Sequence, residues 1–269
     1  MKPQNNVTVP SFTLLAVETS TEACSAALYF DGSYYEVFER QPQKHAHRIL
    51  EMVDEVLNQA GISGFNVDYL AFGEGPGAFT GTRIAAGVIQ GLALGWQKPV
   101  INISSLEAIA EATVKQVAAA LVTTNLTLSE QTITWCALMD ARMQEVYYLQ
   151  GQYHPHSGLW QVQDAQLLPP DCALEQIKVL NQEHYVHQGL LIGVGDVKSS
   201  YPGLVNAFKS WHDALPSALS VVRLAQVKLA DTTYRDSLSD HDVPMPVYLR
   251  NHVADTIIER ALKNQLNTR

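Results

Sequence analysis

The chain has 269 residues, of which 46% are hydrophobic and 17% are charged, and its formal net charge is −9. This length and apolar content predict a globular protein of one or two domains with a sizeable core. The Lys and Arg residues form no basic stripe, which argues against tight nucleic-acid binding by this chain alone, because such binding depends on neutralised phosphates. The polar N-terminal residues and the lack of a long apolar run argue against a signal peptide and a membrane span, and favour the cytoplasm.

The first half of the chain predicts a sheet combined with helices. Alternating apolar residues predict strands at 13–17, 25–30, 34–38, 67–72 and 99–103. Apolar residues at helical spacing predict helices at 48–60, 81–95 and 104–122. Asp31-Gly32 is typical of a two-residue hairpin turn. Ser104, with Glu107 three residues later, predicts a capping box at the start of the third helix.

A glycine-rich loop joins the strand at 67–72 to the helix at 81–95. Its candidate residues are Gly75, Pro76, Gly77, Thr80, Gly81 and Arg83. Glycines there allow positive φ angles and a close backbone approach, and the free N–H groups of the first helical turn favour an anion or a tightly packed partner. No Lys-Ser or Lys-Thr follows the glycines and no third glycine has the dinucleotide spacing, so neither phosphate-binding fingerprint is present.

The second half repeats the order of the first. After a polar link at 123–131, strands are predicted at 134–139, 145–152 and 159–163, and a helix at 219–230. Glu18 ends the first strand of the first half, and Asp140 ends the first strand of the second. Such paired carboxylates have two interpretations: they accept hydrogen bonds from their own turns, or they are remnants of a nucleotide site.

Four segments together resemble the TsaB (YeaZ) family, which takes part in making threonylcarbamoyladenosine at position 37 of transfer RNA. They occur in the family's order: LLAVETSTEACS at 14–25, GEGPGAFTGTRIAAG at 73–87, MDARMQEVY at 139–147 and PVYLR at 246–250. The second segment resembles the family signature GPGSFTGxRIG. The resemblance covers residues 12–250, which makes agreement by chance a poor explanation.

The resemblance implies an α/β fold with the two lobes of actin, hexokinase and Hsp70, built from duplicated β-β-β-α-β-α units. It divides the chain into a first lobe at 12–122, to which a helix at about 219–232 returns, and a second, smaller lobe at 123–218. Residues 233–269 form a C-terminal segment.

The resemblance also implies a non-catalytic scaffold. Its partner is a TsaD-like subunit that transfers threonylcarbamoyl from an AMP adduct to tRNA, with a TsaE-like ATPase as a third component and tRNA contacted only through the complex. The TsaD-like enzyme carries a His-x-x-x-His metal pair, and the aligned positions here are Ser105 and Ile109. Isoleucine cannot ligate a metal. We therefore expect no catalytic residue, metal or cofactor in this chain.

Two enzymatic alternatives stay open. An ATP-dependent small-molecule kinase or ATPase of the same fold would use Glu18 and Asp140. However, the turn after Glu18 lacks glycine and adds a second carboxylate, Glu22. A glycoprotease-like peptidase is disfavoured, because the chain has neither an H-E-x-x-H nor a G-x-S-x-G motif.

The helix at 81–95 predicts a subunit interface. Each interior glycine costs about 1 kcal/mol relative to alanine, yet three glycines recur at four-residue spacing, which lets another helix approach closely. We expect this helix to pair with the helix at 48–60 across an interface, either in a homodimer or with the TsaD-like subunit. The expected interface residues are Ile49, Met52, Val53, Val56, Ile84, Gly87, Val88, Gly91 and Gly95.

Overall fold

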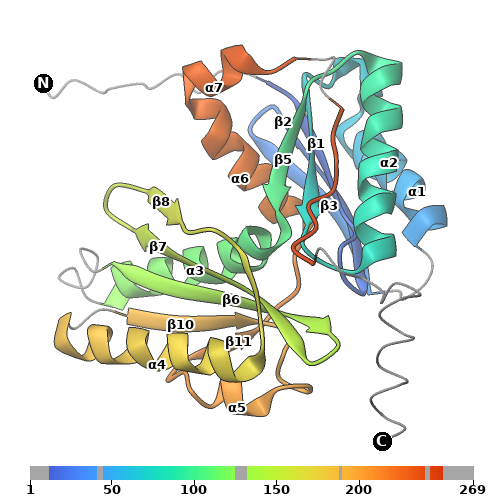
Figure 1. Cartoon of the computed structure of the whole chain (residues 1–269). Coiled ribbons are helices and arrows are strands. Elements are labelled where there is room, and N and C mark those ends of the chain that lie inside the picture. The colour runs from blue at the N-terminus through green and yellow to red at the C-terminus, as the bar shows by residue number, and fades with distance from the viewer. Residues whose placement is uncertain (1–11, 41–44, 125–131, 188–189, 240–242, 251–269) are drawn as a thin grey trace, which may run out of the picture.

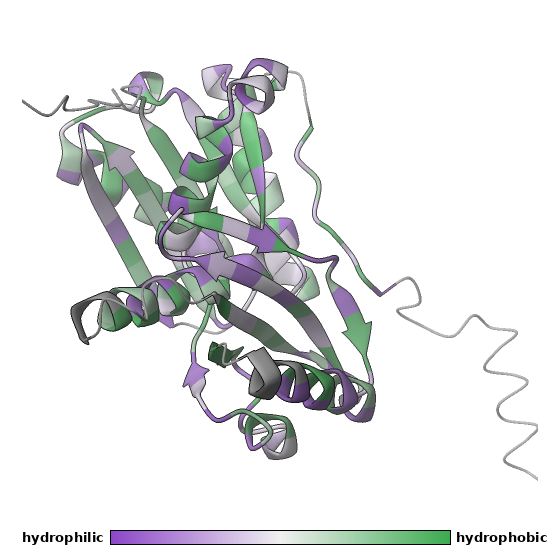
Figure 2. Ribbon diagram, turned by 90° about the vertical axis from the view of Figure 1, so that its left-hand side faces the viewer, coloured by the Kyte–Doolittle hydropathy of each residue, from purple (hydrophilic) through white to green (hydrophobic). Residues whose placement is uncertain are grey.

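The computed structural model describes residues 12–40, 45–124, 132–187, 190–239 and 243–250. They form two lobes, each built on one mixed β-sheet with helices on both faces (Figure 1). Figure 2 shows that hydrophobic residues concentrate in the strands and in the helix faces turned toward them. Among the described residues, no helix is long and apolar enough to cross a membrane.

The first sheet has the strand order β3-β2-β1-β4-β5. Its strands are β1 Leu14–Glu18, β2 Ala23–Phe30, β3 Ser33–Arg40, β4 Tyr69–Gly75 and β5 Val100–Ser104. β1, β2 and β3 pair antiparallel, whereas β4 and β5 continue parallel to β1. Asp31 and Gly32 both have positive φ, at 47° and 76°, as the predicted hairpin turn requires.

Helices α1 His45–Ala60 and α2 Phe79–Trp96 pack on one face of the first sheet. Helix α6 Ala218–Ala230 packs on the other face. A short 3-10 turn, Gly64–Asn66, precedes β4. The helix predicted at 219–230 therefore lies on the first sheet although it follows the second sheet in sequence. A further short helix, α7 Thr232–Ser237, follows it.

The second sheet has the order β11-β10-β6-β7-β8, with β9 also paired to β7. Its strands are β6 Ile133–Arg142, β7 Glu145–His154, β8 Leu159–Val162, β9 Gln166–Leu168, β10 Leu190–Gly195 and β11 Trp211–Asp213. Helix α3 Ser105–Thr124 packs on one face, and α4 Pro170–His187 and α5 Pro202–Val205 pack on the other.

The two sheets have equivalent strand orders, because β6, β7, β8, β10 and β11 take the places of β1, β2, β3, β4 and β5. This duplication confirms the predicted two-lobed α/β fold. α3 and α6 exchange lobes: each packs on the sheet of the other half and they also contact each other. The predicted first lobe, residues 12–122, includes α3 because α3 follows β5 in the chain. In the structure α3 packs its apolar face against the second sheet.

The capping box predicted at Ser104 is wrong. The Ser104 hydroxyl is buried and has no hydrogen-bond partner. Glu107 instead accepts a hydrogen bond from the Trp160 indole, 3.1 Å away. Ser104 belongs to β5, so α3 starts directly from the strand. The spacing is that of a capping box, but the Glu107 side chain binds the Trp160 indole of β8.

Candidate functional site

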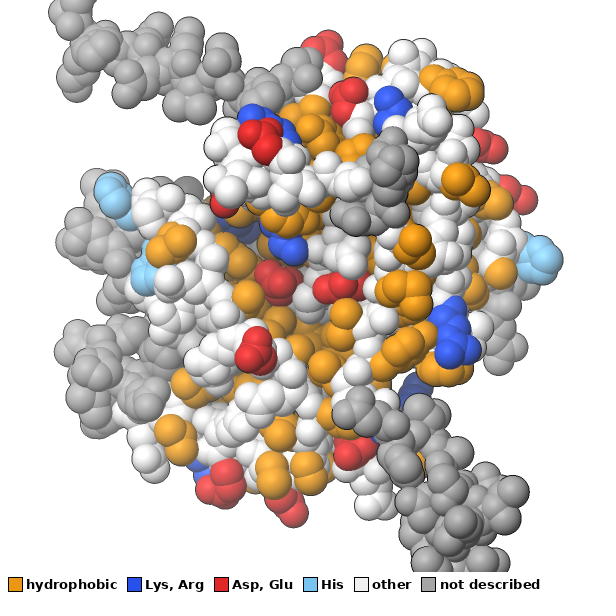
Figure 3. Space-filling view, turned by 45° about the horizontal axis from the view of Figure 1, so that its top comes forward, with side chains coloured by type: hydrophobic (Ala, Val, Ile, Leu, Met, Phe, Trp, Pro, Cys, Tyr) orange, Lys and Arg blue, Asp and Glu red, His pale blue; other side chains and the backbone are white. Residues whose placement is uncertain are grey.

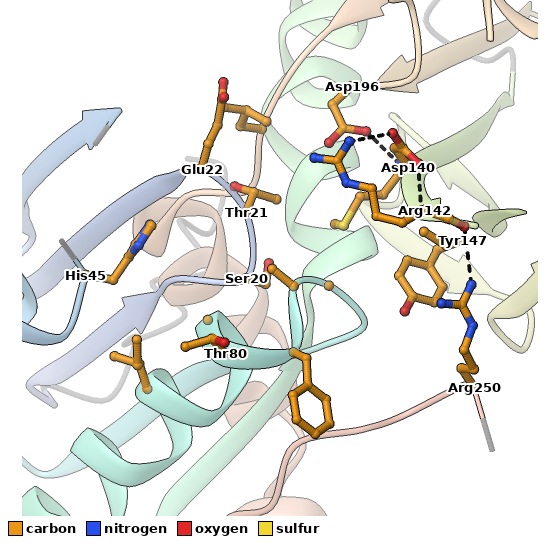
Figure 4. Close-up of a pocket in the computed structure, with 18 of the residues that line it drawn as sticks. Ser20, Thr21, Glu22, His45, Thr80, Asp140, Arg142, Tyr147, Asp196 and Arg250 are labelled. Carbon is orange, nitrogen blue, oxygen red and sulfur yellow. Dashed lines mark hydrogen bonds and ion pairs between the residues drawn. The ribbon is translucent and has the colours of Figure 1, made fainter. Parts of the chain in front are cut away.

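A cleft of about 910 Å³ lies between the lobes. The first lobe supplies the β1–β2 turn and the glycine-rich loop, and the second lobe supplies the ends of β6, β7 and β10 (Figure 4). Its polar lining includes Ser20, Thr21, Glu22, His45, Thr80, Asp140, Arg142, Tyr147, Asp196, Ser200 and Arg250. Cleft and loop together are the candidate functional site.

The glycine-rich loop packs against the turn that follows β1. The Ala78 amide donates to the Ser20 carbonyl at 2.7 Å, and the Thr19 hydroxyl donates to the Gly81 carbonyl at 2.8 Å. A Cβ atom at Gly81 would overlap the Thr19 carbonyl, and one at Gly77 would lie 2.5 Å from the Ser20 carbonyl. The glycines at 77 and 81 are therefore needed for close backbone approach within the chain.

Gly75 and Arg83 connect the loop to a segment near the C-terminus. Gly75 has a φ of 102° and is followed by a cis bond to Pro76. The Arg83 guanidinium lies 3.6 Å from the centre of the Phe79 ring, and its Nε donates to the Tyr248 hydroxyl at 2.9 Å. Thr80 faces the cleft at the start of α2 (Figure 4). Arg83 thus serves a contact within this chain.

The Glu18 carboxylate accepts hydrogen bonds from residues inside the protein. The side chain is 1% exposed, and its carboxylate accepts from the Ser20 amide at 2.6 Å and from the Ser105 hydroxyl at 2.9 Å. Burial raises the pKa of the Glu18 carboxyl, although these hydrogen bonds oppose the rise. Glu18 does not line the cleft. Of its two interpretations, the geometry matches the acceptor of turn hydrogen bonds.

Asp140 has the equivalent position in the second lobe but faces the cleft. Its carboxylate accepts from the Arg142 amide at 2.8 Å and from the Ser200 hydroxyl at 2.9 Å, and pairs with the Arg142 guanidinium at 3.1 Å. The neighbouring Asp196 accepts from the Asp140 amide at 2.9 Å. Burial raises the pKa of Asp196, and the charge of Asp140 adds to the rise.

Ser105 and Ile109, aligned with the metal pair of the TsaD-like enzyme, are both buried. The Ser105 hydroxyl donates to Glu18 and accepts from the Gly75 amide at 3.2 Å. Ile109 belongs to the core under α3. In the described part of the chain, no three His, Cys, Asp or Glu side chains are grouped to hold a metal ion.

The interface predicted between α1 and α2 needs correction. The α1 residues Ile49, Met52, Val53 and Val56 are at most 2% exposed, because they form the core beneath α1 with their own sheet. They are unavailable to a partner.

On α2, by contrast, the three glycines of the stripe are exposed, and a Cβ atom at Gly87, Gly91 or Gly95 would meet no atom within 4 Å. Ile84 and Val88 are partly buried against the core of this chain. The glycine stripe therefore lies on the outer side of α2, beside Leu94, which is 82% exposed.

The sequence interpretation gave no role to residues 243–250, which we call the strap. Pro246 to Arg250 were noted only as a family motif. The strap runs beside α2 in Figure 1 and reaches the second lobe, and Tyr248 and Arg250 line the cleft. Figure 3 shows hydrophobic side chains gathered on this face. Their exposed members include Met245, Val247 and Phe79.

Comparisons with known proteins agree with this architecture. The family model TsaD, tRNA N6-adenosine threonylcarbamoyltransferase, matches residues 37–166. The tRNA threonylcarbamoyladenosine biosynthesis protein TsaB of Haemophilus influenzae is 36% identical over 251 residues, which cover 90% of this chain and 95% of the relative. TsaB of Escherichia coli is 34% identical over 246 residues, covering 90% and 96%.

A solved structure is similar over nearly the whole chain as well. YeaZ from Pseudomonas aeruginosa has 33% sequence identity and a TM-score of 0.66, and the match covers 88% of this chain and 100% of that one. Together with the two TsaB proteins, it agrees with the family predicted from the four sequence segments. This chain belongs to the TsaB (YeaZ) family.

Proposed function

We propose that this chain acts in tRNA threonylcarbamoyladenosine biosynthesis as a non-catalytic scaffold that binds a TsaD-like transferase. The name of its relatives supports the pathway. A TsaE-like ATPase is the third component, and tRNA is bound by the complex. A net charge of −9 leaves this chain poorly suited to hold tRNA by itself.

The observation that carries the proposal is the bare outer side of α2. Gly87 and Gly91 lie inside α2, where each costs about 1 kcal/mol relative to alanine. Nothing within the described chain needs the small size of these glycines or of Gly95, since no atom lies within 4 Å of a Cβ there. A partner helix at close range is a physical use for such a stripe. The TsaD-like subunit, or a second copy of this chain, would supply that helix.

The scaffold role is supported by the two positions aligned with the transferase metal pair. Ser105 is committed to hydrogen bonds with Glu18 and Gly75, and Ile109 fills the core. Replacing either by histidine would have to break that packing. Threonylcarbamoyl transfer therefore belongs to the partner, which this chain would activate by binding.

The proposal is tested by mixing the purified chain with a TsaD-like protein from the same organism. We expect a 1:1 or higher complex by size-exclusion chromatography. When threonylcarbamoyl-AMP is supplied as the donor, we expect modified tRNA only when both proteins and the ATPase are present. The control is each protein alone with tRNA, ATP and the same donor.

ATP turnover by this chain alone on the order of 1 s⁻¹, abolished by Asp140→Asn, would favour the kinase or ATPase alternative. Absence of any complex would remove the scaffold role.

A further inference from the structure

The strap is fixed to the first lobe by contacts along most of its length. The side-chain Nε2 of Gln90 donates to the Pro244 carbonyl at 2.6 Å, near the middle of α2. The Val247 amide donates to the Glu74 carbonyl at 2.7 Å, beside the glycine-rich loop. Tyr248 accepts from Arg83 and packs on Phe79, with ring centres 5.5 Å apart. These contacts hold 244–248 to α2 and β4.

Its last two described residues are fixed to the second lobe. The Leu249 side chain packs against the core beneath α3 and β6. Arg250 pairs with Glu145 at the start of β7, with side chains 16% and 32% exposed. The same guanidinium donates to the Arg142 carbonyl at 3.3 Å and contacts the Met143 sulfur at 3.2 Å. Eight residues thus span from one lobe to the other.

Arg250 binds the β6–β7 hairpin of the second lobe, whose backbone is in a disfavoured conformation. The β6–β7 hairpin turns through three consecutive residues of positive φ, Arg142, Met143 and Gln144, at 61°, 53° and 61°. None is glycine, so each adopts a backbone conformation that L-residues disfavour. Arg250 binds the carbonyl of the first of them and the side chain of Glu145, which follows the last. The strap therefore holds the hairpin tip that bounds the cleft.

The strap is a third bridge between the lobes. The other two are the chain crossings that lead from β5 into α3 and from β11 into α6, and those helices pack together. The strap runs beside α2 (Figure 1), and its Tyr248 and Arg250 line the cleft, whereas no described residue of α3 or α6 lines it. A bridge away from the crossings restrains rotation about them, as a latch restrains a hinge.

We propose that the strap is a latch that sets the angle between the two lobes, and that the Arg250 contact with the β6–β7 hairpin is its releasable end. The first-lobe anchors are numerous and include a backbone hydrogen bond, whereas the polar contacts of the second-lobe end all come from one guanidinium, beside the packed Leu249 side chain. Breaking that end frees the lobes without removing the strap from α2. This proposal does not depend on which protein binds α2.

The test measures the distance between the lobes in the full chain. Cys172 is exposed at the start of α4, whereas burial raises the pKa of Cys24 and Cys136 to about 12 and keeps them unreactive. Adding Asn58→Cys, at an exposed position of α1, gives one labelling site in each lobe. Pulsed electron spin resonance of the doubly labelled protein then reports the distribution of interlobe distances.

We expect one narrow distribution for the otherwise unmodified protein. Arg250→Ala should broaden it and add a longer-distance population, and Glu145→Gln should do the same while leaving the strap sequence intact. The double variant should be no broader than Arg250→Ala, because both changes break one contact. Arg40→Ala, at an exposed arginine at the end of β3, is the matched control and should leave the distribution unchanged.

Circular dichroism checks that each variant is folded. If Arg250→Ala does not fold, Glu145→Gln alone decides. A folded Arg250→Ala or Glu145→Gln protein with the distance distribution of the parent would overturn the latch, as would equal broadening in Arg40→Ala.

Discussion

The two lobes share one strand order but use the ends of their first strands differently. In the first lobe, Glu18 is 1% exposed and hydrogen-bonded to Ser20 and Ser105. In the second, the Asp140 side chain is 11% exposed and lines the cleft. In the first lobe, β4 leads to the 18-residue helix α2. In the second lobe, the equivalent strand β10 leads to the four-residue helix α5.

This difference shows that a repeated acid need not keep a repeated role. The first lobe has closed its turn with glycines and a buried carboxylate, and its long helix presents an open glycine stripe outward. The second lobe has kept an acid at the cleft. The open glycine stripe is the surface at which we propose docking, and the comparison between Glu18 and Asp140 can be tested by substitution.

The largest loss of stability is expected from Gly81→Ala. Its Cβ would overlap the Thr19 carbonyl, a backbone atom that cannot rotate away, so we expect a loss at the upper end of overpacking costs, about 3 kcal/mol. Gly87→Ala, in the same helix, is the matched control and should gain about 1 kcal/mol from helix propensity. Urea unfolding measures both. Equal stability of the two variants would show that the loop does not need its close approach.

The next largest effect is expected from Glu18→Ala. It leaves the buried Ser20 amide and Ser105 hydroxyl without their acceptor, for a cost of about 2–3 kcal/mol. Asp140→Ala, at the more open equivalent position, should cost about 1 kcal/mol. Thermal unfolding of both proteins tests the difference. A larger loss for Asp140→Ala would reverse our comparison of the lobes.

A smaller effect is expected in the pH dependence of stability. Burial raises the pKa of Glu18 above its ordinary value of 4.5, so the folded state binds the proton more tightly than the unfolded state. This contribution is complete below pH 4.5 and is lost as the pH rises through the folded-state pKa. Glu18→Gln should therefore gain stability relative to the parent as the pH rises.

Asp213→Asn provides a control of opposite sign. Its hydrogen bonds from Lys198 and Trp211 lower the pKa of Asp213, so the parent's advantage over this variant should shrink as the pH falls. Because Asp213 loses its proton below its ordinary pKa of 3.8, urea unfolding runs from about pH 2 to about pH 8, in steps of about one unit of pH, and compares both variants with the parent. A difference between Glu18→Gln and the parent that does not change with pH would refute the buried-charge account.

The sequence predicted the fold well because strand and helix periodicities are local. It also predicted that Gly77 and Gly81 allow a close approach. The sequence could not show that the Glu18 carboxylate is buried and hydrogen-bonded, because its partner Ser105 is 87 residues away. The α1 residues Ile49 and Met52 were misassigned to an interface, since periodicity shows that a face is apolar and not what covers it.

The contacts of the strap could not be predicted from the sequence for a related reason. Residues 243–250 have no periodic pattern, and their contacts reach residues more than 100 positions away, such as Glu145 and Arg83. A short motif such as Pro246 to Arg250 helps to identify a family without showing which residues the motif contacts. Only the folded chain brings Arg250 to the β6–β7 hairpin.

The central claim, that the outer side of α2 docks a TsaD-like subunit, is tested most directly by the affinity of that subunit for Gly91→Leu. Isothermal titration calorimetry compares it with the parent and with Gly203→Leu, a control at an exposed glycine of α5 that also has no atom within 4 Å of a Cβ. We predict that Gly91→Leu unfolds at nearly the parent temperature but loses binding, while Gly203→Leu binds normally. A folded Gly91→Leu protein that binds with the parent affinity would contradict the claim.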